Sequence, residues 1–116
     1  MRYVSTRGGV QPQRFSDILL EGLASDGGLY VPESYPRADI AAWRRLDYPG
    51  LATAILRQFM DDVPGLEALV ARTYTAQVYW HTRYGGDAAQ IAPLTRLEDG
   101  LYTQELSTGP TLAFKD

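Results

Sequence analysis

The 116-residue sequence contains no cysteine, one histidine and one lysine, whereas its other ten basic residues are arginines. Without cysteine, the chain can form neither a disulfide nor a thiolate metal site. The single histidine, His81, has no second histidine or cysteine with which to bind a metal, so we expect no metal site. We expect His81 and its aromatic neighbours in 79–84 to pack rather than to act chemically, and residues 84–93 to form a loop.

Long apolar runs and basic runs are also missing. No stretch approaches the length needed to cross a membrane, and the first residues lack the apolar core of a signal peptide. The net charge is −3 and the basic residues are dispersed, which argues against a nucleic-acid partner. We therefore expect a soluble, cytoplasmic protein of about one domain, with an ordinary hydrophobic fraction of 45%.

Hydrophobic spacing predicts about four helices. Apolar residues recur every three or four positions, the period of one helix face, in four segments: 15–23, 40–46, 51–59 and 66–74. Ser16, Asp39 and Pro64 are typical of helix starts, and Pro49-Gly50 is expected to interrupt the chain before the third helix. We expect these helices to form a small packed layer.

Short strands are predicted before, between and after these helices. Residues 3–6 have the composition of a short edge strand, and 29–31 form a short extended segment. Near the other end of the chain, 94–98 and 101–106 flank Asp99-Gly100, which is a strong hairpin signal. The predicted fold class is therefore α+β, with a small helical layer, a short N-terminal strand and a C-terminal β-hairpin.

Other charged residues give weak indications of a site. Arg7 could bind an anion, but a lone charge more often marks a solvated surface, and we favour that interpretation. The adjacent carboxylates Asp61-Asp62 and Glu98-Asp99 fall where a helix end and a turn are expected. We expect these pairs to be solvated.

The only lysine lies in the segment 109–116. Pro110 suits the first position of a helix, and Gly109 accepts backbone geometries closed to other residues. A helix that starts there would place Lys115 near its positive end, where the ammonium form is disfavoured. Judged by position alone, Lys115 is either a solvated lysine at a helix start or a nucleophile that can form a Schiff base with a carbonyl.

Three stretches of the sequence together carry a resemblance to a known family. They are Tyr-Val-Ser-Thr-Arg-Gly at 3–8, a stretch over 15–32 that ends in Asp-Gly-Gly-Leu-Tyr-Val-Pro, and Gly-Pro-Thr-Leu-Ala-Phe-Lys-Asp at 109–116. Their sequences and spacing resemble those of the threonine synthases, which are fold-type II pyridoxal-phosphate enzymes. The last stretch is similar to the family's cofactor-lysine motif, so the resemblance runs from end to end.

This resemblance implies that residues 1–108 form the N-terminal domain of a larger α/β fold-type II enzyme and that 109–116 begin its cofactor-lysine helix. It implies that Lys115 is the catalytic and cofactor-binding residue, which holds pyridoxal 5'-phosphate as a Schiff base. The implied substrate is O-phospho-L-homoserine, which is converted with water to L-threonine and phosphate. The cofactor-binding domains are absent from this chain, so its partner would be the rest of its own chain. We expect the fragment alone to be inactive and not to bind the cofactor.

One departure from the family leaves two alternatives open. Many members have Phe-His where this chain has Ser107 and Thr108. The chain could therefore belong to a threonine-synthase-like phospho-lyase that acts on another phosphorylated amino acid, or it could be a non-catalytic assembly domain in which Lys115 is inert. The Thr111 hydroxyl could cap the lysine helix or touch the cofactor, and we favour capping.

Overall fold

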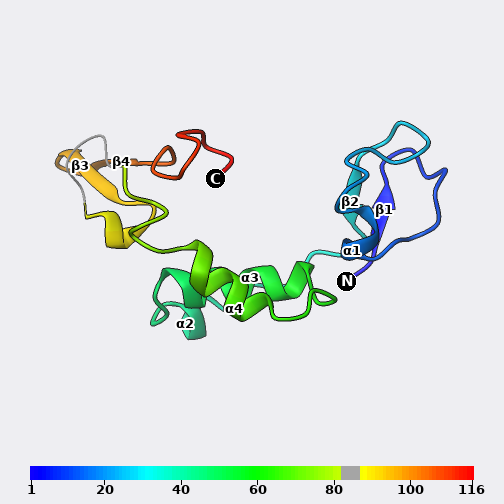
Figure 1. The fold of residues 1–116 in the computed structure, drawn as a ribbon, viewed down its shortest axis with the longest axis horizontal. Helices are drawn as coiled ribbons and strands as arrows, with labels where there is room; N and C mark the ends of the chain where they lie inside the picture. The colour runs from blue at the N-terminus through cyan, green and yellow to red at the C-terminus, as the bar shows by residue number, and fades with distance from the viewer. Residues whose placement is uncertain (82–86) are drawn as a thin grey trace. The chain divides into compact units, whose positions relative to one another are not determined.

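The structure, a computed structural model, describes residues 1–81 and 87–116 of the chain. Within these residues the architecture is α+β, as predicted, with four α-helices, an N-terminal strand pair and a C-terminal hairpin (Figure 1). The chain divides into two compact units, Met1–Ala68 and Leu69–Asp116. The predicted domain boundary at residue 108 stays a prediction. Parts of the aromatic run 79–84 and of the loop expected over 84–93 lie outside the described residues.

The first unit begins with a strand that has partners on both sides. Strand β1 (Tyr3–Ser5) pairs antiparallel with β2 (Tyr30–Pro32). On the other side of β1, Tyr3 exchanges two backbone hydrogen bonds with Gln13, at N–O distances of 2.8 and 2.9 Å. Tyr3 and Ser5 are buried and the residue between them is half-buried, as expected for a strand with one inward face. The sequence predicted an edge strand here, but not these partners.

Helix α1 (Phe15–Ile18) is shorter than the helix predicted over 15–23, and its N-cap is Arg14 rather than Ser16. The leucines that would continue its apolar face are exposed: Leu19, Leu20 and Leu23. A short helix gains most of its stability from burying such a face. The helix therefore ends where that burial ends.

Helix α2 (Ile40–Trp43) begins after Asp39, whose carboxylate accepts a hydrogen bond from the Ala42 N–H at 3.0 Å. This contact confirms the predicted cap, which satisfies one of the N–H groups that a helix start leaves without a partner. Helix α4 (Leu66–Thr73) begins two residues after Pro64, the predicted start. It runs across the division between the two units.

Helix α3 (Tyr48–Phe59) corrects the prediction that Pro49-Gly50 interrupts the chain. Its N-cap is Asp47, whose carboxylate accepts a hydrogen bond from the Gly50 N–H at 2.8 Å. Pro49 lies in the first turn, where a helix makes no use of the missing N–H and where the fixed φ of proline is favourable. The prediction was wrong because proline breaks a helix only in its interior.

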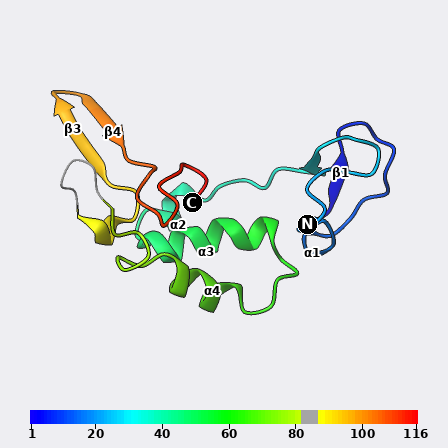
Figure 2. The same ribbon diagram turned by 45° about the horizontal axis from the view of Figure 1, so that its top comes forward.

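The second unit contains the predicted hairpin. Strand β3 (Leu94–Glu98) pairs antiparallel with β4 (Leu101–Gln104), with a register shift between Arg96 and Glu98. Gly100 in the connecting turn has a φ of +79°, which glycine adopts without strain. The hairpin extends away from the turns formed by residues 109–116 (Figure 2). A short 3₁₀ helix, η1 (Ala88–Gln90), precedes it.

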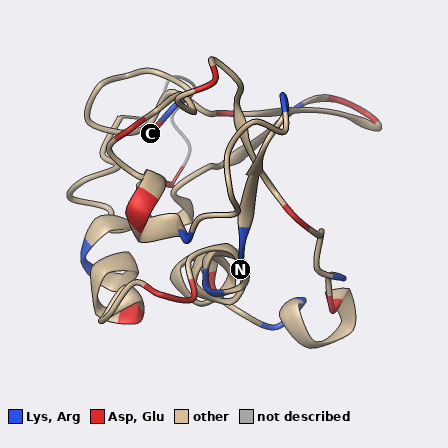
Figure 3. Cartoon of the chain, turned by 90° about the vertical axis from the view of Figure 1, so that its right-hand side faces the viewer, with Lys and Arg blue, Asp and Glu red and all other residues tan. Residues whose placement is uncertain are grey.

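Buried apolar side chains occur in both units. In the described residues they include Tyr3, Ile18, Ala24 and Leu66 in the first unit and Val70, Tyr79, Ile91 and Pro93 in the second. Acidic and basic residues are interspersed along the elements (Figure 3). None of the helices in the described part has the length and apolar composition that crossing a membrane requires.

Candidate functional site

The segment that leads to Lys115 is anchored by a buried threonine. Thr108 is 3% exposed, and its hydroxyl donates a hydrogen bond to the Ile91 carbonyl at 2.6 Å. Its own carbonyl accepts a hydrogen bond from the His81 N–H at 3.3 Å. The half-buried His81 ring lies edge-on to Trp80, with ring centroids 5.4 Å apart. The structure therefore brings His81 to the lysine segment through its backbone.

The acceptor of the Thr108 hydroxyl lies in a strained turn. Ile91 has φ 64° and ψ −59°, and the Ala92 N–H donates to the Gln90 carbonyl at 2.7 Å, which together define a γ-turn. Positive φ is a genuine outlier for a β-branched residue and costs on the order of 1–3 kcal/mol. Ile91 is 2% exposed, so its surroundings hold it in this conformation.

Residues 109–116 form two successive turns, whereas a helix start was expected at Pro110. The Leu112 N–H donates to the Gly109 carbonyl at 3.1 Å, and the Asp116 N–H donates to the Ala113 carbonyl at 3.2 Å. Leu112 has a φ of 57°. A residue in this left-handed region interrupts a right-handed helix, so these residues turn instead of continuing a helix from Pro110. The cofactor-lysine helix stays a prediction.

Asp116 closes this segment into a loop, which we call the lysine loop (109–116). Its carboxylate accepts two hydrogen bonds from Thr111, one from the backbone N–H at 2.9 Å and one from the hydroxyl at 2.6 Å. The Tyr79 hydroxyl donates to the Asp116 backbone carbonyl. A Cβ atom on Gly109 would lie 2.4 Å from the Asp116 Cβ, so only glycine allows the two ends to meet. The Thr111 hydroxyl thus binds a carboxylate instead of capping a helix.

Lys115 is exposed on this loop. Among the described residues, no carboxylate forms an ion pair with its ammonium group. The structure thus presents an accessible amine on a loop that is held at both ends. An amine of this kind can attack an aldehyde or ketone when it is deprotonated.

A second polar cluster lies in the first unit, around Asp26. The Asp26 carboxylate accepts hydrogen bonds from the Ser5 hydroxyl at 2.7 Å and from the N–H groups of Gly28 and Gly9, both at 2.8 Å. The bonds from Ser5 and then Gly28 lower the pKa of Asp26 below its usual value. The guanidinium of Arg7 donates to the Asp26 carbonyl at 3.0 Å. Arg7 is exposed, as expected, but it also supports this turn.

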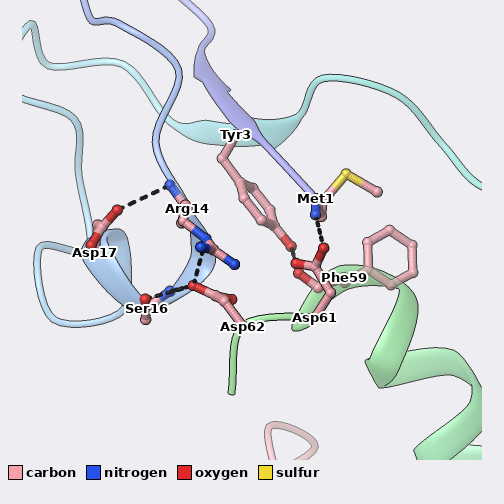
Figure 4. Close-up of polar contacts among 8 residues, drawn as sticks. All are labelled: Met1, Tyr3, Arg14, Ser16, Asp17, Phe59, Asp61 and Asp62. Carbon is pink, nitrogen blue, oxygen red and sulfur yellow. Dashed lines mark hydrogen bonds and ion pairs between the residues drawn. The ribbon is translucent and has the colours of Figure 1, made fainter. Parts of the chain in front are cut away.

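Sequence reasoning missed a third cluster, at Asp62 (Figure 4). The Asp62 carboxylate accepts hydrogen bonds from the Ser16 N–H at 3.0 Å and the Ser16 hydroxyl at 2.5 Å, and it lies 3.6 Å from the Arg14 guanidinium. The bonds from Ser16 lower the pKa of Asp62. Its side chain is 6% exposed, so the expectation of a solvated carboxylate is wrong. The neighbouring Asp61 is 47% exposed and pairs with the amino group of Met1.

Other features of the described residues offer less chemistry. An apolar hollow of about 420 Å³ lies in the first unit, and it is lined by Ala38, Ile40, Trp43, Arg44, Leu51 and Ile55. In the part of the chain that the structure describes, no three His, Cys, Asp or Glu side chains gather closely enough to hold a metal ion. The lysine loop is therefore the strongest candidate for a functional site.

Comparisons with known proteins extend over the whole chain. The family model described as "Threonine synthase N terminus" matches residues 2–74. The chain is 52% identical to threonine synthase of Methylobacillus glycogenes and 44% identical to that of Corynebacterium glutamicum, covering 100% of this chain and 26% and 25% of those proteins. It is also similar to the crystal structure of pyridoxal-phosphate-bound threonine synthase from Brucella melitensis, with a TM-score of 0.82, 36% identity and coverage of 99% of this chain and 24% of that one. The chain therefore spans about a quarter of the length of these relatives.

Proposed function

Because the chain belongs to the threonine synthase N-terminal family, we propose that it forms the N-terminal portion of an enzyme that makes L-threonine and phosphate from O-phospho-L-homoserine and water. The observation that carries the proposal is the 52% identity to a threonine synthase over the whole chain, which includes the lysine loop. A likeness limited to the first 74 residues would support the family, but not a role for Lys115.

In this proposal Lys115 is the residue that holds pyridoxal phosphate. When bound, this cofactor supplies an electron sink for reactions at the carbons of an amino acid. The Nζ atom of Lys115 fits its aldehyde end, because the side chain is exposed and forms no ion pair among the described residues. The same Nζ, when free, would hold and move a proton at the substrate carbons. The rest of the unit orients the loop that carries it.

The remaining cofactor contacts are assigned to the three quarters of the relatives' length that this chain does not span. Exposed apolar side chains support this division. On and just after the hairpin, the leucines and one tyrosine are at least 49% exposed: Leu94, Leu97, Leu101, Tyr102 and Leu106. A two-stranded hairpin is at best marginally stable by itself, and such side chains favour packing against further protein. The 116-residue chain alone should accordingly show no turnover.

The first experiment is the intact mass of the natural gene product in its source cells. A product several times heavier than the 12.9 kDa of this chain supports the proposal. A product of 116 residues would favour the non-catalytic assembly domain.

The second experiment uses the full-length protein. We expect it to release phosphate and form threonine from O-phosphohomoserine, and we expect Lys115→Ala to abolish both. The matched control is Arg45→Ala, which removes an exposed basic side chain that lies outside the lysine loop. Full activity in Lys115→Ala would overturn the role of the lysine. Turnover of a different phosphorylated amino acid alone would identify the phospho-lyase alternative.

A further inference from the structure

Backbone strain in the described residues gathers around the lysine loop. Two non-glycine residues have positive φ, Ile91 and Leu112. Leu112 lies within the loop, and the Ile91 carbonyl accepts the hydroxyl of Thr108, which directly precedes it. Strained conformations persist only where the surrounding structure over-determines them, and they cluster at functional sites. Both strained residues therefore indicate that neighbouring contacts hold the lysine loop.

The contacts that hold this conformation converge on Asp116. Its carboxylate binds the N–H and hydroxyl of Thr111, its backbone carbonyl accepts from Tyr79, and its Cβ fills the space that Gly109 leaves open. Hydrogen bonds to an ionised carboxylate are stronger than those between neutral groups. Tyr79 is 6% exposed, so it ties the loop to a buried part of the unit.

We propose that Asp116 and Thr111 are positioning residues for Lys115, and that Tyr79 anchors the lysine loop to the rest of the second unit. Neither the carboxylate nor the hydroxyl needs to touch the cofactor or substrate. They fix the two ends of the loop, so that the backbone of Lys115 stays in one position and its Nζ can reach the reacting atoms. A small displacement of a reactive group costs much of its rate, which is why such support is needed. This inference rests on the proposed function of Lys115.

The test uses the full-length protein with Thr111→Val, which removes the hydroxyl at nearly constant volume, and Thr111→Ser, which restores it. The matched control is Thr103→Val on β4, outside the loop. Two quantities are measured. Hydrogen–deuterium exchange of the 109–116 peptide is followed by mass spectrometry in the cofactor-free protein, and kcat and KM for phosphate release are measured with saturating cofactor.

We expect Thr111→Val to increase exchange in the 109–116 peptide by about tenfold, the effect of losing one hydrogen bond to a charged group. We expect a fall in kcat of at least about tenfold with little change in KM, because the loop acts on the reacting amine and not on substrate affinity. Thr111→Ser should recover both quantities, and Thr103→Val should match the wild type. Wild-type exchange and kcat in Thr111→Val would overturn the proposal. So would a loss of kcat that Thr111→Ser fails to restore.

A second pair of variants keeps the test decisive if Thr111→Val folds poorly. Tyr79→Phe removes only the hydroxyl that binds the Asp116 carbonyl, and Tyr35→Phe is its control because Tyr35 is 75% exposed. Faster exchange of 109–116 in Tyr79→Phe alone supports the anchor, and equal exchange in the two variants overturns it. If the wild-type protein does not act on O-phosphohomoserine, the proposed function fails, whereas the exchange measurements still test how the loop is held.

Discussion

The Asp62 cluster allows one stability prediction to be worked through from the structure. Asp62 follows helix α3 and binds Ser16, which is 46 residues earlier in the chain. One carboxylate oxygen, Oδ2, accepts both bonds from Ser16, while Oδ1 is buried and has no hydrogen-bond partner among the described residues. Asp62→Asn keeps the shape of the side chain and removes its charge. The substitution therefore tests how much the negative charge of Asp62 contributes to its hydrogen bonds with Ser16.

The expected loss of unfolding free energy follows from the two oxygen positions. Hydrogen bonds to a charged group contribute about 1.5–3 kcal/mol, against about 1 kcal/mol for a neutral pair. The asparagine amide must also place its NH₂ group where Oδ1 is buried, and an unsatisfied buried donor costs about 1–3 kcal/mol. Because the two effects overlap, we expect a loss of about 2 kcal/mol. At roughly 4 °C per kcal/mol for a domain of this size, the melting temperature should fall by about 8 °C.

The adjacent residue provides the control. Asp61 is 47% exposed, and an exposed ion pair contributes about 0–1 kcal/mol, so Asp61→Asn should cost less than half as much. Both variants would be compared with the wild type by urea and thermal unfolding at pH 7. An Asp62→Asn variant no less stable than Asp61→Asn would refute the reasoning.

The pH dependence gives an independent check with a definite sign. The pKa of Asp62 is lowered in the folded state, chiefly by the hydrogen bonds from Ser16. Its carboxylate therefore contributes stability above its unfolded pKa of about 3.9, and that contribution is lost as the pH falls through the lower, folded value. The gap between the wild type and Asp62→Asn should be largest above about pH 5 and should shrink below about pH 4. A gap that stays constant down to pH 2 would contradict the assignment.

Three further predictions use other contacts. Thr108→Val should cost about 1–3 kcal/mol in urea unfolding, because it leaves a buried carbonyl without a donor, whereas Thr108→Ser should cost less. Tyr30, whose hydroxyl donates to Glu21 at 2.7 Å, should titrate at a pKa of about 12. Because the pKa of Tyr30 is raised in the folded state, its neutral phenol adds stability below the ordinary pKa of 10.0, and this stability is lost as the pH rises through the folded value. Glu21→Gln should lower the Tyr30 pKa measured by NMR. Gly28→Ala would place a Cβ 2.1 Å from the Ser5 hydroxyl oxygen and should destabilise the chain by about 2 kcal/mol. An unchanged melting temperature would contradict this prediction.

Local sequence signals predicted the features that depend on a few neighbouring residues. The cap at Asp39 and the hairpin turn at Asp99-Gly100 each involve residues that lie within four positions of one another, and both are present in the structure. The end of α1 was mispredicted, because periodicity reports a possible apolar face and not whether that face is buried. The bond between Ser16 and Asp62 has no sequence signature, since it joins two segments that only the fold brings together. A pair of adjacent acidic residues is therefore a poor guide to whether either one is solvated.

For the lysine loop, the sequence motif predicts the residue of interest, and the structure adds the contacts that hold it. The sequence indicates Lys115, whereas only the structure shows that Thr108 is buried and donates a hydrogen bond to the Ile91 carbonyl. In the resembled family this position often holds a histidine, which could exchange a proton near neutral pH. Here Thr108 is 3% exposed, and its hydroxyl donates to the Ile91 carbonyl. A group held in this way supports the loop and is not free to exchange protons with a substrate. If the proposed function holds, the departure at Thr108 changes how the loop is held, and the proton chemistry would fall to Lys115.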